Sequence, residues 1–119
     1  MNWGGAERRR YIRANFPCKI IVYAPQEHTI KTHTKDISAG GVRVLIGEKL
    51  AVNSAVGVEI NLKDKPIICK GRVVWVKENE AASLQTVLRF MTGVEFKQIN
   101  EEDKAAIDNF VKAVTFGSK

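Results

Sequence analysis

The sequence predicts an all-β fold that ends in one α-helix, namely a small antiparallel barrel of about six strands with the helix at the C-terminus. Three observations lead to this prediction. Short segments rich in apolar and β-branched residues recur between residues 17 and 96, and most of them alternate apolar with polar side chains. No helical spacing interrupts these segments, which argues against parallel strands joined by helices. The apolar spacing becomes helical only after residue 97.

Six segments are predicted as strands, with turn residues or polar residues between them. The segment at residues 84–96 could form one strand or a pair of strands. In chain order the segments are residues 17–24, 29–36, 42–46, 56–62, 67–76 and 84–96. Residues 77–83 are polar and are expected to form a loop.

Glycines mark the irregular points of this pattern. Gly71 lies in the middle of its strand and indicates a bulge or bend, and Gly93 indicates a kink. Gly40 and Gly41 break the alternation between the second and third strands, either to supply positive φ angles or to expose backbone. Residues 36–41 are therefore expected in the connection between these two strands, where a ligand can reach the chain.

The C-terminal helix is expected at about residues 100–115. Asn100 can cap it, and three acidic residues occupy its first turn. Apolar residues then recur at helical spacing, at Ala106, Ile107, Phe110, Val111 and Val114. This apolar stripe is expected to face the barrel, with partner docking as the alternative.

One domain accounts for the chain. Its 119 residues can bury a hydrophobic core without metal or disulfide support. Residues 1–7 carry two glycines and no periodicity, so we expect a flexible N-terminal segment in which Trp3 is a possible clasp. The folded domain is expected to span residues 8–119.

The charge balance favours an anionic partner. Nineteen Lys and Arg against thirteen Asp and Glu give a net charge of +6. Four arginines against one glutamate in residues 1–13 supply half of this excess. A nucleotide, a nucleic acid, an acidic protein or a membrane surface would suit such a chain.

Other residue types give no sign of an enzyme or a metal site. Cys18 and Cys69 lack the C-x-x-C spacing and are expected to be buried, while His28 and His33 have no carboxylate or cysteine companion. No nucleophile-base pair or carboxylate pair is recognisable, so we expect neither catalysis nor a cofactor. No apolar run has the length of a membrane span or the form of a signal peptide, and the cytoplasm is the expected location.

Two short segments together indicate a nucleotide site. The first holds Arg8, Arg9, Arg10 and Arg13, of which Arg9 and Arg13 would share one face if the segment turns helically. Guanidinium groups bind phosphates bidentately and also stack on purines or donate to guanine edges. The second segment, residues 36–41, offers a carboxylate, a hydroxyl and glycine backbone. Taken alone, the first segment reads more simply as a solvated arm or nonspecific polyanion binder, and the second as a structural turn.

The combination resembles the two-part signature of PilZ domains, receptors for the bacterial second messenger cyclic di-GMP. Arg9-x-x-x-Arg13 and Asp36-x-Ser38-x-x-Gly41 match it in residue type and spacing. The segments Gly71-Arg72-Val73-Val74-Trp75 and Gly93-Val94-Glu95-Phe96 also resemble PilZ core segments, in the expected order before a terminal helix.

The resemblance implies a six-stranded antiparallel barrel with the arginine arm, residues 8–13, folded onto the ligand. Arg9 and Arg13 would bind phosphates and guanine, and Asp36 and Ser38 would hydrogen-bond a guanine or adjacent groups. Gly41, next to Gly40, would permit close approach. Arg43 points to the same neighbourhood, and Arg8 resembles the pattern of members that bind a stacked pair of ligands. Trp75 is either a core aromatic residue or a stacking wall for the ligand.

We therefore expect a receptor rather than an enzyme. Ligand phosphates would order the arginine arm on the barrel and so create a surface for a separate partner protein. Loss of Arg9 and Arg13 is expected to abolish binding and leave barrel stability nearly unchanged. Two alternatives stay open: a basic barrel for single-stranded nucleic acid, disfavoured by its poor aromatic platform, and a PilZ-like interaction module without ligand.

Overall fold

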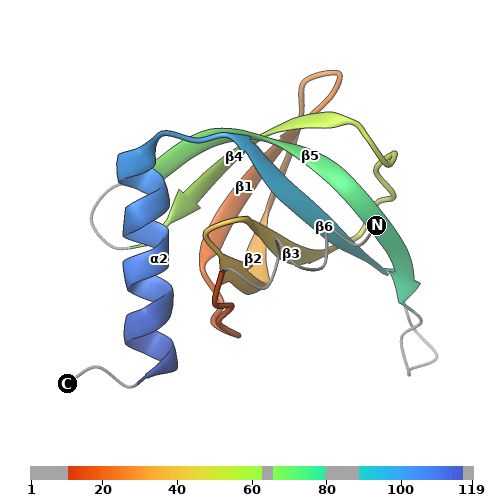
Figure 1. Cartoon of the computed structure of the whole chain (residues 1–119). Helices are drawn as coiled ribbons and strands as arrows, with labels where there is room; N and C mark the ends of the chain where they lie inside the picture. Colours follow the sequence, from red (N-terminus) through yellow and green to blue (C-terminus); the bar gives the residue numbers. More distant parts are fainter. Residues whose placement is uncertain (1–10, 63–65, 80–88, 117–119) are drawn as a thin grey trace, which may run out of the picture.

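The computed structural model describes residues 11–62, 66–79 and 89–116, and in this part of the chain six antiparallel strands close into a barrel beside one helix (Figure 1). The strands follow one another around the barrel in the order β1-β2-β3-β6-β5-β4. The elements are β1 (Lys19–Ala24), β2 (His28–Ser38), β3 (Gly41–Ile46), β4 (Ala55–Asn61), β5 (Pro66–Asn79), β6 (Arg89–Gln98) and α2 (Glu101–Thr115). The predicted six-stranded antiparallel barrel with a C-terminal helix is confirmed.

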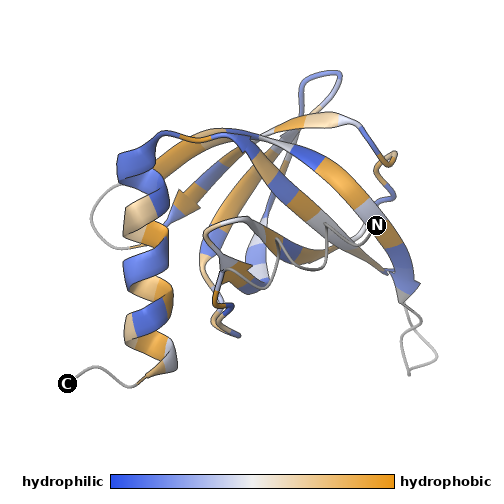
Figure 2. Cartoon of the chain, viewed as in Figure 1, coloured by the Kyte–Doolittle hydropathy of each residue, from blue (hydrophilic) through white to orange (hydrophobic). Residues whose placement is uncertain are grey.

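The barrel interior is filled by the apolar residues of the alternating pattern. Side chains from every strand are buried there, for example Val22, Ile37, Val44, Ile60 and Val73. The intervening residues face solvent, so hydrophilic and hydrophobic bands alternate along the strands (Figure 2). Burial of one face of every strand against the others fixes the register of the barrel.

The connection between β2 and β3 is shorter than predicted. Strand β2 continues to Ser38 and β3 begins at Gly41, so only residues 39 and 40 lie between them. Asp36 and Ser38 are therefore strand residues, because they pair with Arg43 and Gly41 across the β2–β3 ladder. Neither Gly40 nor Gly41 adopts a positive φ, so the prediction that they supply one is wrong.

Strand β5 is longer than predicted and contains two irregularities. The predicted loop was wrong for residues 77–79, which pair with β6. The register shifts at Gly71, which confirms the expected bulge, and again between Val73 and Trp75. This second shift turns Trp75 outward, to 37% exposure, while Val73 is fully buried. Strict alternation would place both residues on one face, but an extra residue in a bulge reverses the alternation.

Other predicted limits agree with the structure to within a few residues. Strand β1 begins at Lys19 rather than at residue 17, and β4 ends at Asn61 rather than at residue 62. Residues 84–88 of the last predicted strand lie outside the described residues, and the rest of that segment lies in the single strand β6.

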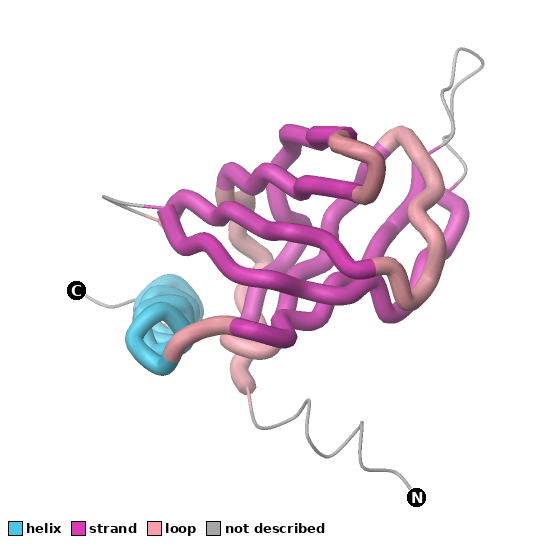
Figure 3. Tube along the Cα trace, turned by 90° about the horizontal axis from the view of Figure 1, so that it is seen from above, coloured by secondary structure: helices cyan, strands magenta, loops and turns pink. Residues whose placement is uncertain are grey.

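Helix α2 lies outside the barrel wall, as the view from above shows (Figure 3). Asn100 caps it as predicted, since its side-chain oxygen accepts a hydrogen bond from the backbone N–H of Asp103 at 2.7 Å. The predicted apolar stripe faces the barrel through Ile107 and Val111, which are fully buried. Phe110 packs edge-on against Phe16, with ring centroids 5.3 Å apart.

Both cysteines are buried as predicted, and burial raises the pKa of both thiols. Burial, with a smaller contribution from Asp103, raises the pKa of the Cys69 thiol to about 11. An unfolded thiol ionises near pH ~8.5, so between these values the unfolded state binds fewer protons than the folded state. Stability is therefore expected to fall as pH rises, by up to ~1.4 kcal/mol per pH unit.

The variant Cys69→Val tests this expectation. Urea denaturation between pH 8 and 10.5 should show a shallower decline of the unfolding free energy for the variant than for the wild type. The other titratable groups are the same in both proteins, so equal slopes would contradict the expectation.

Candidate nucleotide-binding pocket

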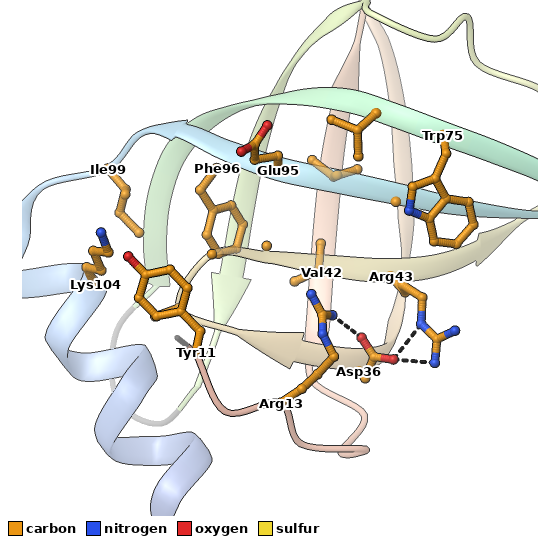
Figure 4. A pocket seen from close by; sticks show the side chains of 16 residues that line it. Tyr11, Arg13, Asp36, Val42, Arg43, Trp75, Glu95, Phe96, Ile99 and Lys104 are labelled. Carbon is orange, nitrogen blue, oxygen red and sulfur yellow. Dashed lines mark hydrogen bonds and ion pairs between the residues drawn. The ribbon is translucent and has the colours of Figure 1, made fainter. Parts of the chain in front are cut away.

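A pocket of about 700 Å³ lies on the outer surface of the barrel, where β2, β3, β5 and β6 meet the segment before β1 and the first turn of α2 (Figure 4). This volume is typical of small-molecule sites, which span roughly 300–1,000 Å³. It is lined by Tyr11, Arg13, Asp36, Ala39, Gly40, Gly41, Val42, Arg43, Val74, Trp75, Gly93, Val94, Glu95, Phe96, Ile99 and Lys104.

A buried carboxylate organises two arginines at the pocket wall. The side chain of Asp36 is only 1% exposed, and each of its oxygens pairs with a different guanidinium group. Arg13 pairs with Oδ1, whereas Arg43 donates from Nε and Nη2 to Oδ2. The arginine side chains are 40% and 43% exposed, so the pairing fixes them while leaving part of each guanidinium open to solvent.

The strand pairing explains why these three side chains meet. Asp36 and Arg43 face each other across the β2–β3 ladder. Arg13 comes from the segment before β1, and its neighbour Ala14 forms a bridge to Ile37 through two backbone hydrogen bonds of 2.9 and 3.0 Å. Arg13 thus belongs to an extended segment anchored on β2, not to a helical turn as first considered.

Ser38, Gly40 and Gly41 make close contacts at the turn between β2 and β3. Ser38 is buried and is not a lining residue; its hydroxyl accepts a hydrogen bond from the N–H of Gly40 at 3.1 Å. A Cβ at Gly40 would lie 3.1 Å from the ring of Tyr11, and a Cβ at Gly41 would lie 2.3 Å from the backbone oxygen of Val94. These glycines therefore allow Tyr11 and β6 to pack closely against the turn.

Trp75 forms an aromatic wall at the pocket. The bulge in β5 places both Val74 and Trp75 on the outside, each 37% exposed. The indole lies against Gly93 on β6, where a Cβ would come within 2.4 Å of the indole Nε1. Trp75 is therefore not a core residue and lines the pocket, while its predicted role as a stacking wall for a ligand stays a prediction.

The sequence model of the PilZ domain matches residues 7–113. The chain belongs to the PilZ domain family. The resemblance seen in the two motifs is thereby confirmed over nearly the whole chain. Among curated proteins, none matches the sequence.

Several solved structures share the fold of this PilZ domain. The inhibitor of motility MotI (DgrA) of Bacillus subtilis matches with a TM-score of 0.77 and 21% identity, over 94% of this chain and 53% of that chain. The PilZ domain of Escherichia coli YcgR with cyclic di-GMP matches with a TM-score of 0.73 and 15% identity, over 93% and 94%. MrkH of K. pneumonia in complex with cyclic di-GMP matches with a TM-score of 0.73 and 16% identity, over 93% and 54%. The chain thus spans about half the length of MotI and MrkH.

The PilZ pocket collects most of the residues that the sequence singled out. Arg13, Asp36, Gly40, Gly41, Arg43 and Trp75 all line it, Ser38 lies beneath the turn, and Arg8, Arg9 and Arg10 lie outside the described residues. Sequence reasoning missed Tyr11, Glu95, Phe96 and Lys104 as lining residues. Glu95 and Phe96 belong to the segment Gly93-Val94-Glu95-Phe96, and its resemblance to a PilZ core segment was the available signal.

No group of His, Cys, Asp or Glu side chains in the described part of the chain has the arrangement of a metal site. Among the described residues, no helix combines the length and apolar character needed to cross a bilayer.

Proposed function

We propose that this PilZ domain is a non-enzymatic receptor for cyclic di-GMP, which binds in the pocket described above. The observation that carries the proposal is the pair Arg13 and Arg43 held on the two oxygens of one buried carboxylate, Asp36. One carboxylate against two guanidinium groups leaves a net positive charge at the pocket wall, and the other charged lining residues, Glu95 and Lys104, offset each other. Each guanidinium has five N–H donors, so donors remain for phosphate or guanine oxygens after Asp36 is satisfied.

The adjacent part of the pocket wall supplies the stacking surface that a purine needs. Trp75 presents an indole beside the arginine pair (Figure 4). Stacking of a base on an aromatic side chain contributes about 1–3 kcal/mol and does not depend on base edges. Two relatives that share the fold, YcgR and MrkH, have been solved with cyclic di-GMP, which supports this ligand over other nucleotides.

The arginine arm completes the proposal. Arg8, Arg9 and Arg10 directly precede Tyr11, which lines the pocket, and consecutive Cα atoms are about 3.8 Å apart, so these arginines can reach a ligand there. Ligand phosphates would neutralise the mutual repulsion of the arginines and order the arm. The ordered arm and ligand would then present a new surface to a partner protein.

Isothermal titration calorimetry tests the ligand directly. Cyclic di-GMP is expected to bind at micromolar concentration or below, because several charged hydrogen bonds of roughly 1.5–3 kcal/mol each act together. GMP and a short single-stranded oligonucleotide serve as competitors. Absence of heat at tens of micromolar cyclic di-GMP would refute the proposal, and preference for the oligonucleotide with a steep salt dependence would support the nucleic-acid alternative.

The variant Gly93→Ala should weaken binding without unfolding the barrel. The new methyl group would occupy the place of the indole of Trp75, which is the mobile end of a side chain and can swing away. We expect affinity for cyclic di-GMP to fall about tenfold, which corresponds to ~1.4 kcal/mol of lost stacking. Calorimetry and thermal unfolding measured together check this, with Gly57→Ala on the far strand β4 as control. If Gly93→Ala binds cyclic di-GMP as tightly as the wild type, Trp75 does not contact the ligand.

A further inference from the structure

Helix α2 contributes a charged side chain to the pocket. Among residues 101–104, which begin the helix, only Lys104 lines it, whereas the three acidic residues before it do not. The ammonium of Lys104 lies over the ring of Tyr11, 5.0 Å from the ring centroid. Such a cation–π contact holds the ammonium at this end of the pocket.

Tyr11 is itself fixed from the other side. Its ring packs on the turn between β2 and β3, where it approaches the Cβ position of Gly40 to 3.1 Å. Two residues later in the chain, Arg13 pairs with Asp36. Lys104 and the arginine pair are thus connected through one short segment, residues 11–13. Figure 4 shows Tyr11 and Lys104 at one end of the pocket and Trp75 at the other.

A second aromatic contact ties α2 to the same segment. Phe110, less than two turns after Lys104, packs edge-on against Phe16. Phe16 is held in turn, since its carbonyl accepts a hydrogen bond from the hydroxyl of Thr34 on β2 at 2.9 Å. Residues 11–16 therefore carry both the contacts to α2 and the arginine that pairs with Asp36.

We propose that Lys104 is an additional phosphate-binding residue of this pocket, supplied by α2 and oriented by Tyr11. The inference rests on the proposed function, because it assigns a second cationic contact to the same cyclic dinucleotide. Such a ligand carries two phosphates and two purines. A purine on Trp75 with one phosphate at the arginine pair leaves the second phosphate for the end of the pocket that Lys104 lines. Ligand binding would thereby tighten α2 against the segment before β1.

Two substitutions of Lys104 separate the effect of its charge on ligand binding from the effect of its long side chain. Lys104→Met keeps a long apolar stem over Tyr11 and removes the charge, whereas Lys104→Arg keeps the charge. Lys112→Met is the matched control, because Lys112 lies on the same helix, pairs with Asp108 at 3.0 Å and does not line the pocket. Calorimetry with cyclic di-GMP and thermal unfolding without ligand are measured for the wild type and all three variants.

We expect Lys104→Met to bind about tenfold more weakly, Lys104→Arg to bind within about twofold of the wild type, and Lys112→Met to be unchanged. Unfolding temperatures without ligand should stay close to that of the wild type. Equal affinity of Lys104→Met and the wild type, or equal losses in Lys104→Met and Lys112→Met, would overturn the inference while leaving the proposed receptor function intact. Absence of binding by the wild type would refute the receptor function itself.

Discussion

Replacing Arg13 and Arg43 together by alanine is expected to abolish cyclic di-GMP binding and also to destabilise the fold by about 3–5 kcal/mol. The side chain of Asp36 is 1% exposed, and its two carboxylate oxygens form ion pairs with these two guanidinium groups. Without them a carboxylate is left buried and unpaired, which is the costly way to break an ion pair. Urea denaturation and calorimetry measure the two effects separately.

Adding Asp36→Asn to the double variant should restore most of the lost stability and none of the binding. The amide has nearly the same shape as the carboxylate but no charge to desolvate. Arg72→Ala is the control, since Arg72 is exposed on β5 and does not line the pocket. A double variant as stable as the wild type would show that Asp36 does not depend on the arginines, and recovery of binding in the triple variant would exclude them as the ligand contacts.

This result would also separate what the sequence could show about the arginine arm from what it could not. The sequence alone predicts that loss of Arg9 and Arg13 leaves the barrel nearly unaffected. The structure changes that expectation for Arg13, because its partner Asp36 is a buried strand residue rather than a residue of an exposed turn. Burial of one end of an ion pair depends on the packing of three separate segments, which a local motif does not report.

The fold itself followed from local patterns. Strands with strict alternation, such as β4, were predicted to within one residue, because burial of one face imposes period two on the sequence. The helix was equally clear from its cap at Asn100 and its spacing. Errors arose where a bulge reverses the alternation, as at Trp75, since a bulge depends on the partner strand and leaves no fixed pattern.

The pocket was predictable only in its motif residues. Arg13, Asp36 and Arg43 were found through residue type and spacing. Lys104 lies in a helix whose first turn reads as an ordinary charged surface, so its contribution depends on how α2 docks. Chemistry carried by a motif can be read in a sequence, whereas chemistry carried by docking of a distant element requires the structure.

The variant Gly41→Ala is expected to destabilise the domain by about 3 kcal/mol, near the upper end of the cost of inserting atoms into a packed site. A Cβ at this position would lie 2.3 Å from the backbone oxygen of Val94 and 3.2 Å from the Cα of Glu95. These are backbone atoms of β6, which is paired with β3 from Phe90 to Glu95 and cannot move aside as a side chain can. Strands β3 and β6 would have to separate. Gly41 is therefore required mainly for the close packing of these two strands.

Substitutions at two other glycines, Gly47 and Gly40, test whether Gly41 is required for the packing of β3 against β6. Gly47→Ala, where a Cβ meets no atom within 4 Å, should change the unfolding free energy by less than about 0.5 kcal/mol. In Gly40→Ala the tight contact would be with side-chain atoms, the ring of Tyr11 at 3.1 Å, while Ser38 Oγ at 3.7 Å is in ordinary contact. We therefore expect a smaller loss of stability than for Gly41→Ala, together with weaker ligand binding. If Gly41→Ala unfolds like the wild type and loses only its ligand, then the glycine makes room for the nucleotide rather than for β6. The order of the three unfolding midpoints in urea decides between these two roles.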